Sequence, residues 1–390
     1  MANAQIQSFI HQIQAWFSQA KTTAPEDILQ ELPSPVITEL TEQFQKFPTP
    51  TPYQTWVHEQ LNQAIETWKN DENAPNSLVI LANPVVPLAQ ILQDSLNTWE
   101  SSCENLRFFP PQIGLSRPPE PLSMISQLQN LLHDVNAEET ENTTSNKTGI
   151  VIPALEQCFL RCIQGWEGIE FLQNVVSKDR SRFWLIGCNT WTWLFLDFVC
   201  QISAYLESVI FLIPLSGEQL QTCFEPLMRQ MTTLDLELCH ESYWKSLANL
   251  ASGVNSIAAH LWLESLRVRA GDIQEEDDGC AELTETDSGC LTMKITVNLR
   301  TTYPVLPSLP ELTILDRYLL HSVLLHGRIR VSHLAITLGE PENVIRSRVQ
   351  VLCRGGILWR QQGIVGVHPI YYPKLKAELM SNNFFVAQDL

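Results

Sequence analysis

Short apolar runs alternate with longer amphipathic stretches between residues 77 and 212 of this 390-residue chain. The apolar runs at 78–81, 105–109, 149–152, 183–186 and 208–212 have the length and composition of buried strands. The stretches at 88–99, 122–133, 155–176 and 191–205 repeat apolar residues at the helical period. This alternation predicts an α/β fold, in which a mostly parallel sheet is sandwiched by helices.

Helical patterns flank this region on both sides. Apolar residues at positions 6, 9, 10, 13 and 17 form one face of a helix, and further helices are predicted at 36–47 and 53–68. We expect this helical N-terminal arm to pack on its own domain rather than to dock a partner. Residues 217–231, 240–251 and 254–268 predict a second helical unit. Two loops interrupt the core, a Pro-rich one at 109–121 and a polar, mobile one at 136–147.

The last hundred residues have a pattern of their own. A helix at 311–325, a short helix at 332–337 and a helix at 342–354 are followed by a hairpin pattern at 357–369. Helix, helix, turn, helix and two-stranded wing predict a winged helix. The linker at 271–289 holds eight acidic residues and no basic one. The predicted domains are therefore 1–70 (N-terminal arm), 71–213 (core), 214–270 (helical unit), 271–290 (acidic linker) and 291–390 (winged helix).

Charge and hydropathy narrow the classes of partner. The formal net charge is -18, from 43 acidic and 25 basic residues, so the body of the protein repels nucleic acid and anionic membranes unless basic residues cluster. The most apolar region, 183–214, is interrupted by polar residues and is too short to span a bilayer. No signal peptide is evident at the N-terminus. We therefore expect no membrane insertion.

Cysteine and histidine spacing gives no sign of a metal site. The ten cysteines form no C-x-x-C pair, which predicts reduced side chains and a cytoplasmic location. Cys158 and Cys162 are spaced as on one helix face, but no further ligand accompanies them. His321, His326 and His333 are close in sequence without metal-ligand spacing, and we expect them at the surface or at helix caps. No metal and no cofactor are predicted.

The turn after the first core strand has the position of a phosphate-binding loop without its residues. When the chain is laid on G-x-x-x-x-G-K-[ST], Ala82 and Pro87 take the glycine positions, Leu88 the lysine and Ala89 the hydroxyl position. Leu88 cannot donate to a phosphate and Ala89 cannot bind magnesium. Pro84 and Pro87 have no backbone N–H. The strand–turn–helix frame is therefore predicted to persist without its phosphate chemistry.

The second half of such a site is also missing. The aspartate that holds magnesium should end the strand at 149–152, where the chain has Pro153 and Ala154. Glu156 is the nearest acid, and alone it is expected to be a first-turn helix residue favoured by the helix dipole. Two independent defects at the expected spacing predict that the chain is not an enzyme and does not hydrolyse ATP.

This order of elements resembles the AAA+ and STAND classes of P-loop ATPases, especially the origin-recognition-type branch, over roughly residues 60–390. The resemblance implies that the helical unit is a lid and that Asn189, which ends the strand FWLIGCN, is a polar sensor of the γ-phosphate. It implies a second sensor region at 252–255, with Arg267 or Arg269 as its cation. Some members of these classes act as scaffolds or switches without hydrolysis.

The predicted winged helix is the basic part of an acidic chain. On helix 342–354, Arg346, Gln350 and Arg354 share an outer face, with Arg348 nearby, where a DNA reader places long donors. Further arginines that could hold a nucleic-acid backbone are Arg328, Arg330 and Arg360. The other interpretation is a protein-binding winged helix whose arginines meet acidic neighbours. The acidic linker and the net charge of -18 favour the protein contact.

The sequence therefore predicts a catalytically inactive, ATPase-like scaffold or regulator that acts through protein contacts. One alternative is a transcriptional or replication-type regulator that binds DNA. Another is a non-hydrolysing nucleotide sensor, in which backbone groups of 82–86, including Asn83, and the side chain of Asn189 hold a base or phosphate. Self-association is left open by the sequence.

Overall fold

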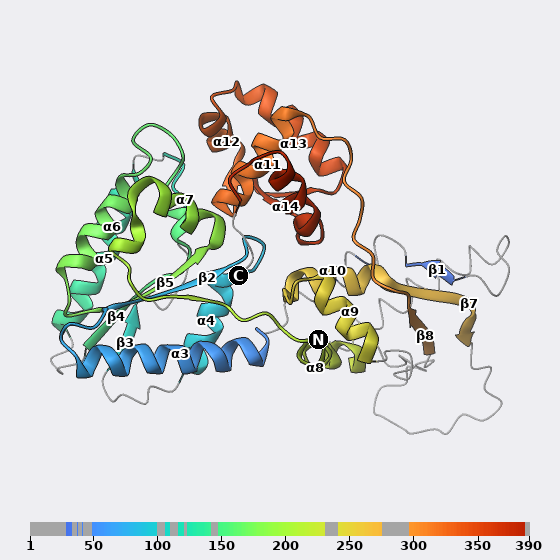
Figure 1. Ribbon diagram of the computed structural model, residues 1–390, viewed down its shortest axis with the longest axis horizontal. Coiled ribbons are helices and arrows are strands. Elements are labelled where there is room, and N and C mark those ends of the chain that lie inside the picture. The colour runs from blue at the N-terminus through green and yellow to red at the C-terminus, as the bar shows by residue number, and fades with distance from the viewer. Residues whose placement is uncertain are drawn as a thin grey trace, which may run out of the picture. The chain divides into compact units, whose positions relative to one another are not determined.

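The computed structural model in Figure 1 describes residues 29–32, 37, 41, 49–99, 106–109, 116–120, 123–141, 147–230, 241–274 and 296–386. The chain forms two compact units. One joins Pro48–Pro214 to Pro307–Leu390, and the other joins Met1–Phe47 to Leu215–Leu306. The part of the chain from Pro307 onward is thus in one unit with the core, whereas the residues between the acidic linker and Leu306 belong to the other unit. The predicted helix over residues 6–17 lies outside the described residues.

The core sheet has five parallel strands in the order β3-β4-β5-β2-β6. This confirms the predicted α/β class. Strands β5 and β2, which pair with each other inside the sheet, are buried along their whole length. This explains why their sequences are unbroken apolar runs. The strands are β2 (Ser77–Ala82), β3 (Leu106–Phe109), β4 (Lys147–Ile152), β5 (Phe183–Asn189) and β6 (Val209–Phe211).

Helices cover both faces of this sheet (Figure 1). On one side lie α3 (Thr51–Asn70), which the sequence assigned to the N-terminal arm, and α4 (Leu88–Thr98). On the other side lie α5 (Met124–Glu141), α6 (Glu167–Lys178) and α7 (Thr190–Cys200). The connection after β2 leads to β3 and the connection after β5 leads to β6, in opposite directions across the sheet. The carboxyl ends of β2 and β5 therefore form a topological switch point, where open α/β sheets bind ligands.

Several predicted helices have different bounds in the structure. The helix predicted at 155–176 is wrong, because a short 3-10 helix η2 (Leu155–Gln157) is separated from α6 by an irregular loop. Leu160 N–H donates to the carbonyl of Gly165 at 3.0 Å. The turn is so tight that a Cβ on Gly165 would lie 2.0 Å from the carbonyl oxygen of Leu160. Cys158 and Cys162 therefore do not share a helix. The loop predicted at 136–147 is partly wrong too, since α5 continues to Glu141.

The helix predicted at 191–205 is also shorter than expected. It ends at Cys200, because Gln201 adopts the left-handed conformation with φ of 50°, and a separate 3-10 helix η3 (Ile202–Ala204) follows.

The second unit contains the helices α8 (Gly217–Gln230), α9 (Glu241–Leu250) and α10 (Asn255–Ser265). The ring of Phe224 lies 5.7 Å from Trp244 and 5.4 Å from Trp262, so aromatic side chains fill its core. The helix predicted at 254–268 is too long. It ends at Ser265, and Arg267 and Arg269 lie on the following strand. An antiparallel sheet β1-β7-β8 completes the unit, with β1 (Leu29–Glu31), β7 (Leu266–Gln274) and β8 (Thr296–Thr301).

We call residues 307–390 of the first unit the C-terminal module. It contains three helices, α11 (Ile314–His326), α12 (Val331–Leu338) and α13 (Glu342–Arg354). A small antiparallel sheet has the order β10-β11-β9, and a last helix follows it. These elements are β9 (Ile329–Arg330), β10 (Leu358–Gln361), β11 (Ile364–Val367), a 3-10 turn η5 (Pro369–Tyr371) and α14 (Tyr372–Ser381).

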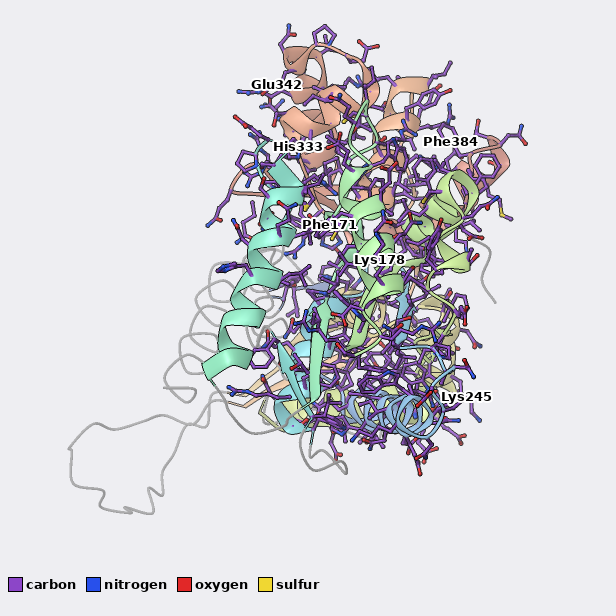
Figure 2. All side chains as sticks on the ribbon, turned by 90° about the vertical axis from the view of Figure 1, so that its left-hand side faces the viewer. Phe171, Lys178, Lys245, His333, Glu342 and Phe384 are labelled. Carbon is purple, nitrogen blue, oxygen red and sulfur yellow. The ribbon has the colours of Figure 1, made fainter. Side chains whose placement is uncertain are left out.

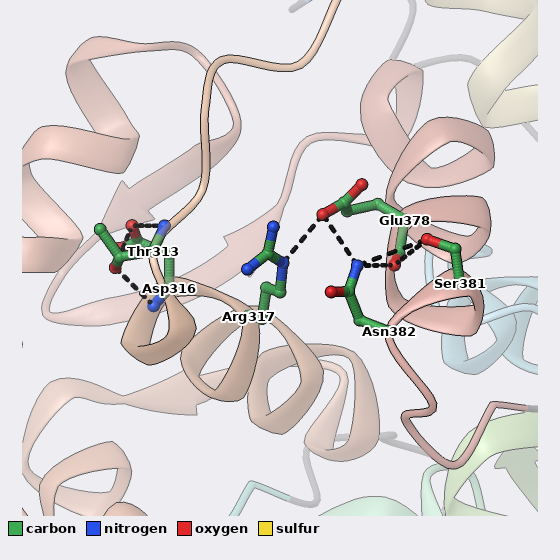
Figure 3. Close-up of polar contacts among 6 residues, drawn as sticks. All are labelled: Thr313, Asp316, Arg317, Glu378, Ser381 and Asn382. Atoms are coloured by element: carbon green, nitrogen blue, oxygen red, sulfur yellow. Dashed lines mark hydrogen bonds and ion pairs between the residues drawn. The ribbon is translucent and has the colours of Figure 1, made fainter.

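Polar contacts fix α11 within the module (Figure 3). Thr313 and Asp316 form a capping box at its N-terminus, in which each side chain bonds to the backbone N–H of the other residue. Arg317 Nε donates to Glu378 Oε1 of α14 at 2.8 Å. The last helix, which the sequence did not predict, is therefore attached to α11.

None of the helices among the described residues combines the length and the hydropathy that crossing a bilayer requires. The cysteines that the structure describes are free thiols: Cys158, Cys162, Cys188, Cys200, Cys223 and Cys353.

Candidate functional site

The turn between β2 and α4 lies at the switch point, and its amides bond within the turn. Val86 N–H donates to the carbonyl of Asn83 at 2.9 Å, and Leu88 N–H donates to that of Val86 at 2.8 Å. Pro84 and Pro87 contribute no donor. The side chain of Leu88, at the lysine position, is buried with 6% exposure. The backbone N–H groups of Val86 and Leu88 therefore already bond within the turn, whereas a phosphate-binding loop would point such groups at the phosphate.

Asn189 ends β5 and stands opposite Ala82 in the sheet. Its Oδ1 accepts from Thr192 N–H at 2.8 Å and so caps α7. Its Nδ2 donates to the carbonyl of Leu325 in α11 at 3.3 Å, and Thr192 Oγ1 donates to the same carbonyl. Carbonyls in the last turn of a helix have no partner within it. Asn189 and Thr192 of the core thus supply donors to one such carbonyl of α11, that of Leu325.

Glu156 lies beside Asn189, in the first turn of the short 3-10 helix η2 rather than in that of a long α-helix. Its Oε2 accepts from Asn189 N–H at 3.2 Å. Gly327, with a positive φ of 65°, stands over the carboxyl group: a Cβ there would lie 3.5 Å from Glu156 Oε1. Desolvation raises the pKa of Glu156 to about 7, against the lowering effects of the backbone hydrogen bonds and of Arg117 and Arg328.

Arg117 is a site residue that the sequence did not reveal. It lies in the Pro-rich segment 116–120 and is 4% exposed. Its Nε donates to the carbonyl of Phe159 at 2.7 Å, and its Nη2 donates to that of Glu156. Its Nη1 donates to the carbonyl of Arg328 in the C-terminal module at 3.5 Å. Burial lowers the pKa of Arg117 to about 10, so it remains a cation at neutral pH. A guanidinium therefore bridges the core and the module.

Two more side chains join η2 to the end of α11. Gln157 Nε2 donates to the carbonyl of His326 at 2.9 Å and to that of Arg328 at 3.2 Å. Arg161 N–H donates to His326 Nε2 at 3.2 Å, and His326 Nδ1 then donates to the carbonyl of Ser322 at 2.8 Å. One ring nitrogen accepts and the other donates, as in a neutral imidazole. Burial holds the pKa of His326 well below its ordinary value.

The predicted surface positions of the three histidines are wrong, and of the three His326 lies in the last turn of a helix, as a cap residue would. His326 and His333 are fully buried and His321 is 6% exposed. His333 Nε2 lies 2.9 Å from the carbonyl of Pro119, so segment 116–120 contacts α12 as well. In Figure 2, His333 lies at the boundary between the C-terminal module and the upper end of α5. Among the described residues no group of histidine, cysteine and acidic side chains could hold a metal ion.

Aromatic side chains continue the contact between the core and the module. Tyr372 Oη donates to Asn83 Oδ1 at 3.3 Å and accepts from Trp191 Nε1 at 3.1 Å. The ring of Phe159 lies 5.1 Å from that of His326, and Trp191 lies 5.6 Å from His321. A further aromatic pair across this contact is Phe198 of the core and Phe385 of the module, whose ring centroids lie 5.7 Å apart. The module is therefore attached by apolar area as well as by hydrogen bonds.

Helix α13 keeps an outward face. Arg346, Gln350 and Arg354 are exposed there, as predicted, and Arg346 forms an ion pair with Glu342. Arg348 does not belong to this face, because its Nε and Nη2 donate to the two carboxylate oxygens of Asp316. Asp316 is 1% exposed, so Arg348 neutralises a buried charge.

Apolar side chains accompany these arginines on the same helices. Val344 is 36% exposed and Val351 52% exposed on α13, and Ile336 on α12 is 51% exposed. Arg328 and Arg360 are exposed, whereas Arg330 is partly buried on β9. The exposed surface of α13 therefore carries both cations and apolar groups.

The structure brings the predicted residues of the degenerate site to one edge of the sheet. Ala82 ends β2, and Asn83, Pro84, Pro87, Leu88 and Ala89 form the turn and the start of α4. Pro153 and Glu156 follow β4, and Asn189 ends β5. Three of them, Asn83, Glu156 and Asn189, contact the C-terminal module. Arg267 belongs to the other unit, where it pairs with Glu31 at 3.2 Å.

No family model and no curated protein matches the chain. Among solved structures, the RuvB Holliday junction branch migration motor of Thermotoga maritima is 15% identical with a TM-score of 0.30, covering 82% of this chain and 94% of its own. Cdc6p from Pyrobaculum aerophilum is 11% identical with a TM-score of 0.36, covering 88% and 98%. A chain of the HORMA:CdnC:Trip13 complex of E. coli MS115-1 is 9% identical with a TM-score of 0.32, covering 58% and 80%.

Proposed function

We propose that this chain is a catalytically inactive, AAA+-like and STAND-like P-loop ATPase homologue that acts as a scaffold or regulator. The C-terminal module is, in this proposal, a winged helix that serves as its interaction module. The helices α11, α12 and α13 followed by the β10–β11 hairpin support that assignment. The strand–turn–helix of β2 and α4 supports a P-loop ancestry.

One observation carries the proposal: the module occupies the hydrogen-bonding groups of the switch point. Leu325 accepts from Asn189, Gly327 covers Glu156, and Tyr372 bonds to Asn83. A nucleotide phosphate at this edge would have to displace those contacts. It would find Leu88 and Ala89 where a lysine and a hydroxyl are needed.

Nucleotide titration in a calorimeter tests inactivity. We expect no heat of binding when ATP and magnesium are added to the full chain, and no release of phosphate above that of buffer. The matched control is an active P-loop ATPase under the same conditions. Micromolar affinity without turnover would favour the nucleotide sensor instead, and turnover would refute the proposal.

The protein contact is assigned to the outward face of α13. Val344 and Val351 are exposed on this helix, and Arg346 is already paired with Glu342, which suits a protein surface better than a phosphate backbone. Purification of the native full chain should retain a partner that Val351→Asp loses. The control is Ile163→Asp, since Ile163 is 91% exposed on the core. A partner retained equally by both variants would exclude this face.

DNA binding is the second candidate, and the exposure of Arg354 and Gln350 favours it. They are one turn apart on α13 and both point outward. Such residues on an exposed helix can reach base edges or phosphates. The net charge of -18 opposes the approach of a polyanion.

A further inference from the structure

Exposed apolar side chains continue from the core onto the C-terminal module beside their contact. Phe198 on α7 is 78% exposed, and its ring lies 5.7 Å from that of Phe385, which is 46% exposed. His321 Nε2 of α11 donates to the carbonyl of Phe385 at 2.9 Å, so the chain after α14 is held against α11. Apolar side chains that stay exposed in a contiguous group, rather than singly, mark an interaction surface.

The same group continues along α11. Phe384 is half-buried, and its ring lies 5.0 Å from that of Tyr318 and 5.4 Å from that of His321. Tyr318 is 49% exposed, and Ile314, one turn earlier on the helix, is 71% exposed. We call this group of five side chains the apolar strip: Phe198, Ile314, Tyr318, Phe384 and Phe385.

A cation lies beside the apolar strip without an acid to neutralise it. Arg161 follows η2, and its backbone N–H donates to His326 Nε2 in the last turn of α11. Its guanidinium interacts electrostatically with Tyr318, about two turns earlier on that helix, and burial lowers the pKa of Arg161. Within the described part of the chain, no hydrogen bond or ion pair engages this guanidinium. Its lost hydration is therefore uncompensated.

The arginine that precedes Tyr318 in the chain is already neutralised. Arg317 Nε donates to Glu378 Oε1 of α14 at 2.8 Å (Figure 3). This leaves Arg161 to meet an anion at the apolar strip. Phosphate groups are usually recognised by clusters of arginines, whereas one guanidinium matches the two oxygens of one carboxylate. The net charge of -18 acts weakly at this range, because salt at 0.1 M screens charges beyond about 10 Å.

We propose that the apolar strip and Arg161 bind a segment of a partner protein that carries a carboxylate beside an aromatic or large aliphatic side chain. The carboxylate pairs with the guanidinium, and the apolar side chain covers the rings of Phe198 and Phe385. This is a second interaction surface, and it does not depend on the role of α13. Because the core and the module both contribute to it, the partner binds while the two are in contact.

Fluorine NMR with N-acetyl-4-fluorophenylalanine tests this site, because the probe joins one aromatic ring to one carboxylate. We expect its fluorine signal to shift and broaden as the full chain is added, with a dissociation constant of roughly 1 mM. The carboxamide of the same probe has no charge and should bind at least about tenfold more weakly, since it cannot form a charge-assisted pair with Arg161.

Three variants locate the binding. Arg161→Gln should remove the preference for the acid over the amide, because the guanidinium is lost. Phe198→Ser should weaken both probes, because the exposed ring is lost. The matched control is Arg354→Gln, which removes one exposed cation from α13, a helix that also exposes Val351. This control should bind both probes as the wild type does.

Equal affinity of the wild type for acid and amide would overturn the proposal, even if a variant fails to fold. A preference for the acid that survives in Arg161→Gln, or that is lost in Arg354→Gln, would overturn it too. Analytical ultracentrifugation of the full chain tests the other occupant of the apolar strip. A dimer that dissociates in Phe198→Ser would assign the strip to a second copy of this chain and exclude the proposed partner.

Discussion

The side-chain amide of Asn189 donates from Nδ2 to the carbonyl of Leu325, 136 residues later, at 3.3 Å. Its Oδ1 accepts from Thr192 N–H at the start of α7. One side-chain amide thus caps the core helix α7 and donates to a carbonyl in the last turn of α11 that has no partner within the helix. The position that the resemblance matches to a nucleotide sensor is engaged by protein on both sides.

We expect Asn189→Ala to lower the free energy of unfolding by about 2 kcal/mol, because a helix cap and a buried hydrogen bond are lost together. Urea denaturation followed by circular dichroism measures the change. The matched control is Asn174→Ala on the exposed side of α6, where Nδ2 donates to the carbonyl of Glu170. A cost for Asn189→Ala no larger than that of the control would show that these contacts do not contribute.

Arg117 should be essential to the contact between core and module. We expect Arg117→Ala to lower the free energy of unfolding by at least about 2 kcal/mol, since the carbonyls of Phe159 and Glu156 lose this donor and that of Arg328 keeps only Gln157. Arg117→Lys should not restore it, because an ammonium cannot reproduce the planar fork. Denaturant unfolding measures both.

The control for Arg117 is Arg180→Ala, an exposed arginine that donates to the carbonyl of Glu72 at 3.2 Å. It should be neutral within about 0.5 kcal/mol. Full rescue by lysine at position 117 would mean that charge alone matters there.

The strands of the sheet and its mostly parallel, helix-covered type could be predicted from the sequence, whereas the contact that fills the site could not. Residues 78–81 and 183–186 are strands buried on both faces, so apolar runs alone located them. Motif spacing located the turn after β2. Arg117 carries no such signal, because its partners lie 39, 42 and 211 residues away and are carbonyls, which every residue has.

The same limit applies to the arginines of α13. Arg346 and Arg348 are two positions apart, and periodicity placed neither of them against a particular acid. Asp316, 32 residues earlier, decides that Arg348 is structural. The helix predicted at 155–176 failed because a turn closed by Gly165 separates η2 from α6, and without that turn Glu156 could not face Gly327.

The ion pair of Arg348 and Asp316 gives a pH-dependent prediction. Desolvation opposes ionisation of Asp316, but hydrogen bonds from Arg348 and Thr313 outweigh it and lower its pKa below 3.8. The pair therefore contributes stability that is present above pH 4 and is lost as the pH falls through the folded pKa. Arg348→Gln should cost about 3 kcal/mol at pH 7 and progressively less below pH 4.

Thermal or urea unfolding at pH 7 and at pH 3 measures this difference. Arg346→Gln on the same helix breaks an exposed pair with Glu342 and should cost less than about 1 kcal/mol at either pH. Equal costs for the two variants at pH 7 would contradict the assignment of Arg348 to a buried pair.

Restoring the missing motif residues should not restore hydrolysis. We expect Leu88→Lys combined with Ala89→Thr to give no phosphate release above background. Val86 and Leu88 amides already bond within the turn, two prolines remain, and no aspartate follows β4. A coupled phosphate assay measures turnover, with Ala89→Ser alone as the control that keeps Leu88 buried. Turnover by the double variant would mean that the motif residues alone were missing.

Binding of duplex DNA separates the two candidate roles of α13. We expect the fluorescence anisotropy of a labelled duplex to stay flat as the full chain is added at 150 mM salt, because a body with a net charge of -18 repels the phosphates and Arg346 is paired with Glu342. Binding that falls steeply with salt and weakens in Arg354→Ala would instead assign the exposed face to nucleic acid. Arg180→Ala, far along the chain on the core, is the matched loss of one positive charge. Since both variants change the net charge equally, a difference between them reports contact at α13 rather than long-range attraction.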